Sequence, residues 1–399
     1  MQERNRSAQR GGTQLLQAAE SKMLLAKLST GDEVHRYKKA IVIGFTGKRR
    51  VLSTAPHNGG YRENLTAVFN QDGTVGAGIA CTLKAPTYAE HMALIAKEIG
   101  LDPETACGIS TAAQMENVSV KSETYREVTV TAIVTGGIET NGGRVGDPAD
   151  WHEIGGSSVH TMKLGTINIM LHFNVDLSKG AIARALVTCT EAKTAAIQEL
   201  IAPSRYSRGL ATGSGTDGTI IIANRDSEIC LTNAGKHAKL GELIGKAVIA
   251  AVKEALFLQS GLCPECQHHV LKRMDRFGIT EDLLWEDCQR DSQSPLDRAR
   301  FSVKLDQLAV QGKMVVYTSL YAHLLDQLDW EMITAEEAYE SGIQLLNLMG
   351  MHSALGEVPD GAEECIASMI KLYREGLRDI LAGEGIKENT NTCMCKEEE

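Results

Sequence analysis

The densest group of hydrogen-bonding side chains in this sequence lies in residues 210–223, which read LATGSGTDGTIIIA. Seven consecutive positions combine glycines, hydroxyl groups and one carboxylate: Thr212, Gly213, Ser214, Gly215, Thr216, Asp217 and Gly218. Glycines let a backbone turn tightly and approach a ligand, while hydroxyls and a carboxylate bind polar groups. A β-branched run follows directly, so we predict a ligand-binding loop that leads into a strand.

This loop also contains the letters of the dinucleotide-binding fingerprint, G-x-G-x-x-G, but not its context. That fingerprint requires a strand before the glycines and a helix after them. Here the predicted strand comes after the loop, which argues against a nucleotide site. Asp217 could orient an imidazole, hold a substrate hydroxyl or only cap a turn, and the sequence leaves these roles open.

A second glycine-rich loop, His57-Asn58-Gly59-Gly60, follows another predicted strand. It could place an imidazole, a side-chain amide and backbone N–H groups at one point. Such groups suit amide hydrolysis, which needs a proton carrier and donors for the developing oxyanion. Asn-Gly is also the strongest short-range turn signal, so a plain turn is the alternative.

Charged residues near two predicted helices are further candidates. His237 precedes a predicted helix, whose dipole disfavours a positive charge and would keep the imidazole neutral as a base near pH 7. A purely structural histidine is the alternative. Glu191 and Lys193 lie in another predicted helix, and their spacing places them on different faces. We expect Glu191 to contact substrate and Lys193 to be solvated.

A cluster of possible metal ligands lies further along the chain. Cys263-x-x-Cys266, with His268 and His269, offers the sulfur and imidazole ligands that zinc prefers. A second ligand pair at regular spacing is missing, although the tail sequence Cys393-x-Cys395 could supply one. A structural zinc ion, a redox pair and unliganded thiols all stay open. Nothing else in the sequence requires a cofactor.

Apolar periodicity predicts the elements that position these groups. Residues 166–175 alternate apolar and polar side chains, which is typical of a strand with one buried face. Strands interleaved with single-faced helices favour a mixed α/β (α+β-like) fold, a sheet core covered by helices. The predicted strands are residues 40–43, 50–54, 65–69, 128–134, 166–175 and 219–223, and the predicted helices are 87–99, 179–200 and 239–258.

The character of the sequence changes near two positions, which predicts three parts. Residues 1–38 form an N-terminal extension with a helical stretch at 15–28. Residues 39–258 form the sheet-and-helix domain. Residues 259–399 form a C-terminal helical appendage that carries the Cys/His cluster.

Composition excludes several classes of partner. The 399-residue chain has a net charge of −10, which argues against a nucleic-acid partner, because phosphate binding needs a basic surface. No apolar run approaches the ~20 residues needed to cross a bilayer, and the N-terminus lacks a signal-peptide core. We therefore expect a cytoplasmic protein that binds a small molecule, without a membrane segment.

Several segments, taken together and in order over residues 39–258, resemble the adenosylcobinamide amidohydrolases of corrinoid salvage. Their order makes the resemblance more specific than any single motif. Thr216-Asp217 matches a Thr-Asp pair of that family. The segments are VLSTAPHNGG (51–60), TAAQMENVSV (111–120), GDPADW (146–151), GTINIMLHFNVDLS (165–178), CTEAKTAAIQEL (189–200), TGSGTDGTIIIA (212–223) and GKHAKLGELIGKAV (235–248).

The resemblance implies hydrolysis of the amide that joins aminopropanol to adenosylcobinamide. The product would be adenosylcobyric acid for coenzyme B12 assembly, and the cobalt-containing corrinoid would be the substrate. Two alternatives stay open: a non-catalytic corrinoid-binding or regulatory protein, and an amidohydrolase that acts on a different amide. The nucleophile would be water or a hydroxyl of the 212–216 loop. Candidate catalytic residues are Asp217, His237, Asn58 and His57, and candidate substrate contacts are Gly59, Gly60, Glu191, Thr212, Gly213, Ser214, Gly215 and Thr216.

Overall fold

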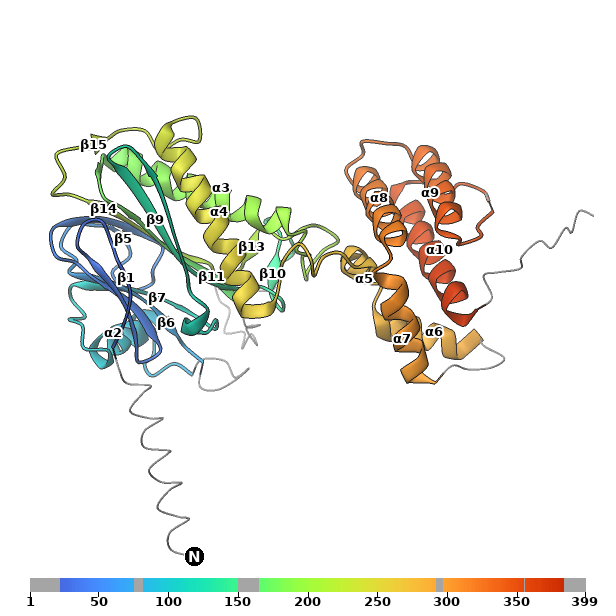
Figure 1. Ribbon diagram of the computed structural model, residues 1–399, viewed down its shortest axis with the longest axis horizontal. Coiled ribbons are helices and arrows are strands. Elements are labelled where there is room, and N and C mark those ends of the chain that lie inside the picture. Colours follow the sequence, from blue (N-terminus) through green and yellow to red (C-terminus); the bar gives the residue numbers. More distant parts are fainter. Residues whose placement is uncertain (1–21, 75–81, 150–164, 292–296, 355, 384–399) are drawn as a thin grey trace, which may run out of the picture. The chain divides into compact units, whose positions relative to one another are not determined.

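The computed structural model describes residues 22–74, 82–149, 165–291, 297–354 and 356–383, and the structural statements below concern these residues. The chain divides after Cys263 into two compact units, which we describe separately (Figure 1). The first unit contains two main β-sheets and three long helices, and the second is helical. The mixed α/β fold with a helical C-terminal part, predicted from the sequence, is confirmed.

Strand β11 (Thr166–Phe173) lies inside a six-stranded sheet, as the sequence predicted. It pairs in parallel with β14 (Gly218–Asn224) and antiparallel with β9 (Val128–Gly137). The remaining neighbours pair antiparallel. The full order is β5 (Gly60–Arg62), β4 (Arg49–Ser53), β14, β11, β9 and β8 (Ser119–Tyr125).

Both faces of β11 are buried, whereas the alternating pattern predicted one buried face. Its odd-numbered apolar residues belong to the core beneath two helices. Met170 belongs to a different core, between the two sheets. Because side chains alternate along a strand, the polar Thr166, Asn168 and His172 share the face of Met170. Alternate side chains of β11 therefore enter two different buried cores, and neither face of the strand is exposed to solvent.

Helices α3 (Lys179–Glu199) and α4 (Lys239–Ser260) cover the outer face of the six-stranded sheet (Figure 1). Their buried faces are rich in alanine, which allows the helices to pack closely against each other and the strands. The Ser178 hydroxyl caps α3, and α4 ends at Gly261, whose φ of +74° lies in the left-handed region that glycine favours. These elements confirm the helices predicted at 179–200 and 239–258.

The second sheet has five strands, three of which (the first, the second and the last in the order below) the sequence did not reveal as strands. Its order is β1 (Met23–Lys27), β2 (Glu33–Tyr37), β3 (Ala40–Gly44), β6 (Ala67–Asp72) and β7 (Ala106–Thr111). The assignment of residues 22–38 to an extension is therefore corrected. Of the helix predicted at 15–28, residues 15–21 lie outside the described residues, and Met23–Lys27 is a strand. These residues form strands because β2 pairs with β3 and β1 pairs with β2, contacts that a local sequence pattern does not reveal.

The two sheets pack face to face and helix α2 (Tyr88–Glu98) covers the outer face of the five-stranded sheet. Residues from both sheets, including Ile43, Val68 and Ile220, form the core between them. Phe69 and Met92 belong to the smaller core under α2. The first unit is thus a four-layer sandwich of helices, sheet, sheet and helix. The short elements are η1 (Met115–Asn117), β10 (Gly142–Gly143) paired with β13 (Gly213–Ser214), and β12 (Asp176–Leu177) paired with β15 (Cys230–Leu231).

The second unit has a core of its own, centred on buried Tyr321 and Tyr373. The Tyr321 hydroxyl donates to the Met369 carbonyl at 2.8 Å, and the Tyr373 hydroxyl lies 2.5 Å from that of Thr318. Both buried phenols are therefore hydrogen-bonded. The elements are α5 (Val270–Met274), η2 (Asp275–Phe277), α6 (Glu281–Asp291), α7 (Arg298–Ala309), α8 (Gly312–Asp329), α9 (Ala335–Met349) and α10 (Ala362–Ala382).

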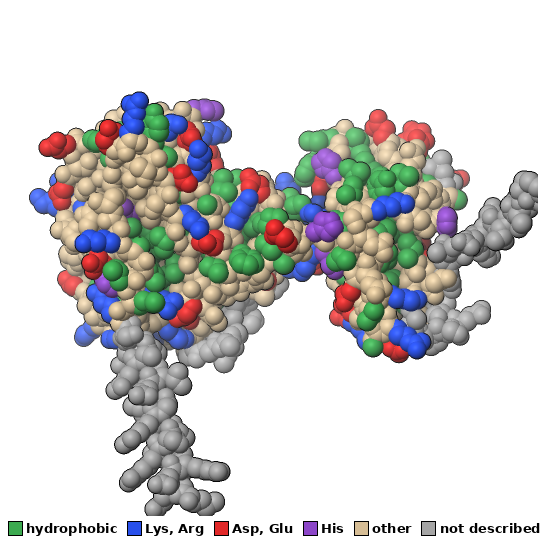
Figure 2. All heavy atoms as spheres, viewed as in Figure 1, with side chains coloured by type: hydrophobic (Ala, Val, Ile, Leu, Met, Phe, Trp, Pro, Cys, Tyr) green, Lys and Arg blue, Asp and Glu red, His purple; other side chains and the backbone are tan. Residues whose placement is uncertain are grey.

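Within the described residues, no helix is both long and apolar enough to cross a membrane. On the face drawn in Figure 2, acidic and basic side chains are interspersed over both units.

Candidate active site

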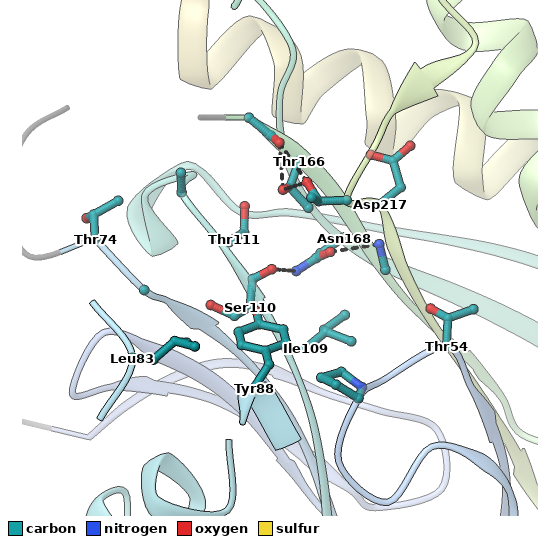
Figure 3. A pocket seen from close by; sticks show the side chains of 16 residues that line it. Thr54, Thr74, Leu83, Tyr88, Ile109, Ser110, Thr111, Thr166, Asn168 and Asp217 are labelled. Carbon is teal, nitrogen blue, oxygen red and sulfur yellow. Dashed lines mark hydrogen bonds between the residues drawn. The ribbon is translucent and has the colours of Figure 1, made fainter. Parts of the chain in front are cut away.

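A cavity of about 610 Å³ opens between the two sheets at one end of the sandwich (Figure 3). Its volume falls within the range of small-molecule sites. Apolar side chains such as Leu83 and Ile109 form part of the wall, and hydroxyl, amide and carboxylate groups form the rest. The lining residues are Thr54, Pro56, Gly73, Thr74, Leu83, Tyr88, Ile109, Ser110, Thr111, Ala112, Gly165, Thr166, Asn168, Thr216, Asp217 and Gly218.

The topology of the sheets explains why these segments meet. Strands β11 and β14 are parallel neighbours, so the segments that precede them lie side by side at one edge. In the other sheet β6 and β7 are also parallel, and the segments that follow them reach the same cavity. The predicted loop at 212–218 therefore faces β7, an element that sequence periodicity did not reveal.

Asp217 is held by four interactions at the start of β14. Oδ1 accepts from the backbone N–H of Ile167 at 2.8 Å and from the Ser214 hydroxyl at 2.7 Å. Oδ2 accepts from the Ser214 backbone N–H at 3.0 Å and forms an ion pair with Lys193. Asp217 is thus both a turn cap and a partner in an ion pair.

The placement of Lys193 corrects the expectation that it is solvated. Its side chain is 12% exposed and reaches from α3 to Asp217, whose side chain is 11% exposed. A Cβ at Gly213 would collide with both charged groups, so glycine at that position leaves the ion pair its space. Glu191, two residues earlier, is exposed on α3 and does not line the cavity. The rotation of α3 about its own axis directs Lys193 toward Asp217 and leaves Glu191 exposed.

A row of hydroxyl groups connects this ion pair with the cavity. The Ser214 hydroxyl lies 3.4 Å from that of Thr216, which lies 2.6 Å from that of Thr166. Figure 3 shows Thr166 and Asp217 at this side of the cavity. Thr166 is buried and Thr216 is exposed, and both line the cavity. We name Thr166, Ser214, Thr216 and Asp217 the hydroxyl row. It provides nucleophilic oxygens with a carboxylate at the far end.

Asn168, which the sequence analysis did not select, anchors the cavity floor (Figure 3). Its side-chain amide donates to Asn70 Oδ1 at 2.7 Å and to the Ser110 carbonyl at 3.0 Å, and its Oδ1 accepts from the Gly218 N–H at 3.0 Å. Asn70 in turn donates to the Thr135 hydroxyl. These bonds join the two sheets. An amide side chain within a strand of strong apolar periodicity was the available signal.

The loop at 57–60 is structural, which corrects its assignment to the catalytic site. The Asn58 amide donates to the carbonyls of Pro103 and Ala106, both at 2.8 Å, and His57 Nε2 also lies 2.8 Å from the Pro103 carbonyl. Asn58 has a φ of 52° and Gly60 a φ of 75°, as tight turns require. A Cβ at Gly59 would collide with the Ala55 carbonyl. Only Thr54 and Pro56 from this segment reach the cavity.

His237 lies at the opposite end of the sheet from Asp217. Asp217 contacts Ile167 at the start of β11, whereas the residues around the start of α4 neighbour the β8–β9 turn, beside the end of β11. Eight residues of strand span roughly 25 Å. His237 is also exposed. The prediction that His237 and Asp217 act together in one site is therefore wrong, because α4 begins at the opposite end of the sheet's strands.

The remaining loop residues have varied places. The Thr212 hydroxyl accepts from the Val145 N–H at 2.9 Å, and Gly215 is exposed with open space around its Cα. In the GDPADW segment, Asp147 accepts from the Ser204 hydroxyl at 2.6 Å. Burial by itself would raise the pKa of Asp147. Hydrogen bonds from Ser204, Ser207 and the Arg144 backbone outweigh burial, so the pKa lies below its ordinary value. Asp150 and Trp151 lie outside the described residues.

The Cys/His cluster does not assemble within the described chain. No three His, Cys, Asp or Glu side chains there come together in a way that could hold a metal ion. His269 instead caps α5, with Nδ1 accepting from the Leu271 N–H at 3.2 Å. Cys263, Cys266 and His268 therefore do not form a metal site with His269. Cys393 and Cys395 lie outside the described residues. Structural zinc stays a prediction that depends on this tail.

Known proteins resemble this chain over part of its length. The family model for adenosylcobinamide amidohydrolase matches residues 25–264. An uncharacterized protein of Methanocaldococcus jannaschii is 36% identical over 231 residues, 55% of this chain and 87% of that protein. An adenosylcobinamide amidohydrolase of Methanosarcina mazei is 28% identical over 210 residues, 51% of this chain and 88% of that protein. Among solved structures, the PH0078 protein of Pyrococcus horikoshii OT3 is 12% identical with a TM-score of 0.29, covering 66% of this chain and 92% of that chain.

Proposed function

The chain belongs to the adenosylcobinamide amidohydrolase family, and from this premise we propose that it hydrolyses the amide between aminopropanol and adenosylcobinamide. The products would be adenosylcobyric acid and free aminopropanol. The reaction would serve corrinoid salvage. One observation carries the proposal: the cavity and its hydroxyl row lie inside the matched region and supply the groups that amide hydrolysis needs.

A threonine hydroxyl of the row is the proposed nucleophile. Thr166 suits this role because it is buried, lines the cavity and lies 2.6 Å from Thr216 Oγ1. Its oxygen attacks the amide carbonyl, its proton goes to the leaving amine, and water then hydrolyses the resulting ester. Asp217 and Lys193 position the row through Ser214.

The size of the cavity suggests which part of the substrate enters. A corrin ring with its side chains is too bulky for a space of about 610 Å³. We therefore expect only the aminopropanol arm to enter, while the ring stays at the mouth. The apolar part of the wall around Pro56, Leu83 and Tyr88 would contact the arm or the ring edge.

The test is incubation of the purified protein with adenosylcobinamide, followed by chromatography and mass detection of adenosylcobyric acid. Asp217→Asn should lower kcat by ~10²-fold, the cost of a misplaced reacting group, because it removes the charge that pairs with Lys193 and positions the row through Ser214. The matched control is Glu191→Gln, an exposed acid on α3 that should keep the wild-type rate.

Two outcomes would contradict the proposal. Corrinoid binding without product, measured from the corrinoid absorbance spectrum, would favour a binding or regulatory protein. Hydrolysis of other amides but not of adenosylcobinamide would assign a different substrate.

A further inference from the structure

The carbonyl oxygen of Gly165 lies at the centre of an unusual group of donors. Asn141 Nδ2 lies 2.5 Å from it, Thr166 Oγ1 2.7 Å, Thr216 Oγ1 3.0 Å and Ser214 Oγ 3.4 Å. A carbonyl oxygen has two lone pairs. Because the Ser214 hydroxyl donates to Asp217 and that of Thr166 can donate to Thr216, Asn141 and Thr216 are the two groups that donate to this oxygen. Donors gathered on one carbonyl are the arrangement that stabilises an oxyanion when that carbonyl is attacked.

The backbone at this carbonyl also depends on glycine. Gly165 has a φ of +145°, which L-residues rarely adopt. A Cβ there would collide with the Asn141 side chain and come within 2.8 Å of the Gly137 carbonyl. Glycine thus keeps Asn141 against the carbonyl and holds the peptide bond to Thr166 in the cavity.

The hydroxyl that follows this carbonyl has a path for its proton. Each hydroxyl carries one proton, so Thr166 can donate to Thr216 Oγ1 at 2.6 Å while Thr216 donates to the Gly165 oxygen at 3.0 Å. Attack by the Thr166 oxygen would therefore pass its proton through Thr216 to the oxygen that becomes negative. Asn141 stabilises that oxygen throughout.

We propose that the protein cuts its own chain between Gly165 and Thr166 and so creates an N-terminal threonine. The Thr166 oxygen adds to the Gly165 carbonyl carbon and forms a five-membered ring that bears a hydroxyl group. The C–N bond then breaks, the proton of that hydroxyl moves to the nitrogen, and an ester between Gly165 and the Thr166 side chain remains. Water hydrolyses the ester, leaving a carboxylate on Gly165 and a free hydroxyl and amine on Thr166.

Cleavage would complete the site, an extension that rests on the proposed amide hydrolysis. A free α-amine beside its own hydroxyl is a recognised base for a threonine nucleophile. Departure of the Gly165 carbonyl would also release Asn141 and Thr216 to bind the carbonyl oxygen of a substrate amide. The donor group that promotes cleavage would thus become the oxyanion site of the hydrolase.

The fold would hold the two pieces together after the cut. Strand β11 follows the cut and pairs at eight positions with β9, which precedes it. Both strands lie inside the same sheet beneath α3 and α4. We expect one particle under native conditions and two polypeptides under denaturing conditions.

Intact mass spectrometry of the denatured full-length protein tests this directly, without any substrate. We expect fragments 1–165 and 166–399, whose masses sum to that of the chain plus one water, and a sequenced N-terminus at Thr166. A chain that stays whole after prolonged incubation, or is cut at another bond, would overturn the proposal.

Variants separate self-cleavage from adventitious proteolysis. Thr166→Val keeps the shape but lacks the hydroxyl and should stay whole, Thr166→Ser should still be cut, and Asn141→Ala should slow the cut by ~10²–10³-fold. The exposed Thr232→Ala is the matched control and should be cut like wild type. Cleavage of a folded Thr166→Val protein at the same bond would overturn the proposal.

The two proposals fail in different ways. A protein that is cut at Gly165 but leaves adenosylcobinamide intact refutes the proposed function alone. A whole chain that hydrolyses adenosylcobinamide refutes self-cleavage alone.

Discussion

Lys193 and Asp217 show how much depends on a single pair of side chains. Both are largely buried, and the pair supports the loop that carries Ser214 and Thr216. Lys193→Met should lower the free energy of unfolding by up to about 3–5 kcal/mol, because it leaves the Asp217 carboxylate without its cation. Amidase activity should fall as well, since Ser214 loses its anchored partner. Urea unfolding and kcat measure the two effects.

The control for Lys193 is Lys253→Met. Lys253 pairs with Glu199 at the surface, where both side chains are about one-third or more exposed. Loss of such a pair typically changes stability by about 0–1 kcal/mol. Equal effects of the two substitutions would contradict a special role for the Lys193–Asp217 pair.

A second prediction concerns His172, which lies near the end of β11 that is far from Asp217. It is fully buried, and its Nε2 lies 3.1 Å from Thr30 Oγ1 and 3.4 Å from Asp32 Oδ2. Burial lowers the pKa of His172 below 6.5, outweighing Asp32, which raises it. The folded protein thus disfavours the proton that the unfolded chain binds below pH 6.5. Stability is therefore present above pH 6.5 and lost as pH falls below it.

Urea unfolding at pH 7.5 and 5.5 measures this loss. Burial raises the pKa of Asp32, but hydrogen bonds from His172, Arg49 and Thr46 outweigh burial and hold it below the ordinary value of 3.8. Asp32 is therefore ionised at both pH values and contributes little to the difference in stability between them. His172→Gln should reduce the difference between the two pH values. Exposed His237→Gln should leave it as in wild type. An unchanged difference in His172→Gln would assign the pH dependence to another group.

At the scale of elements, strands β1 and β2 are part of the sandwich and not an appendix to it. β2 supplies buried Val34 to the core between the sheets, and the preceding turn supplies Asp32, which binds Arg49 through two hydrogen bonds of 2.8 Å. Removal of residues 1–38 would leave β3 as an open sheet edge and Arg49 buried without Asp32. We expect that shortened protein to aggregate or unfold, as judged by circular dichroism and gel filtration.

A chain that begins at Lys22 keeps both strands and is the matched comparison. It should unfold at a temperature close to that of the full chain. A stable, monodisperse protein lacking residues 1–38 would show that the sequence-based boundary at residue 38 was the better one.

At the scale of the whole molecule, the candidate site belongs entirely to the first unit. The family model ends at residue 264, one position after the first unit ends, and every residue that lines the cavity precedes it. A chain ending at Cys263 should therefore fold and retain the proposed adenosylcobinamide hydrolysis within a few-fold of the full chain. Steady-state kinetics of both proteins provide the measurement. A folded but inactive first unit would assign the second unit a part in the chemistry.

Local sequence patterns are enough to predict the main elements and the half of the site that lies in one loop. Strong apolar periodicity marks the strand at 166–175 and the helices at 87–99, 179–200 and 239–258, and a β-branched run marks the strand at 219–223. Both patterns reflect local burial. The polar composition of residues 212–218 marked a loop with Thr216 and Asp217, and both line the cavity. These features are local, so a single sequence can carry them.

Contacts between distant segments determine which other residues lie beside that loop. Parallel pairing of β11 with β14 places Thr166 beside Thr216, and the rotation of α3 turns Lys193 inward and Glu191 outward. The length of α4 carries His237 to the far edge, and packing of the second sheet turns Asn58 into a turn residue bonded to Pro103. Strand register and helix rotation arise from contacts between residues far apart in the chain, and no local pattern in one sequence specifies them.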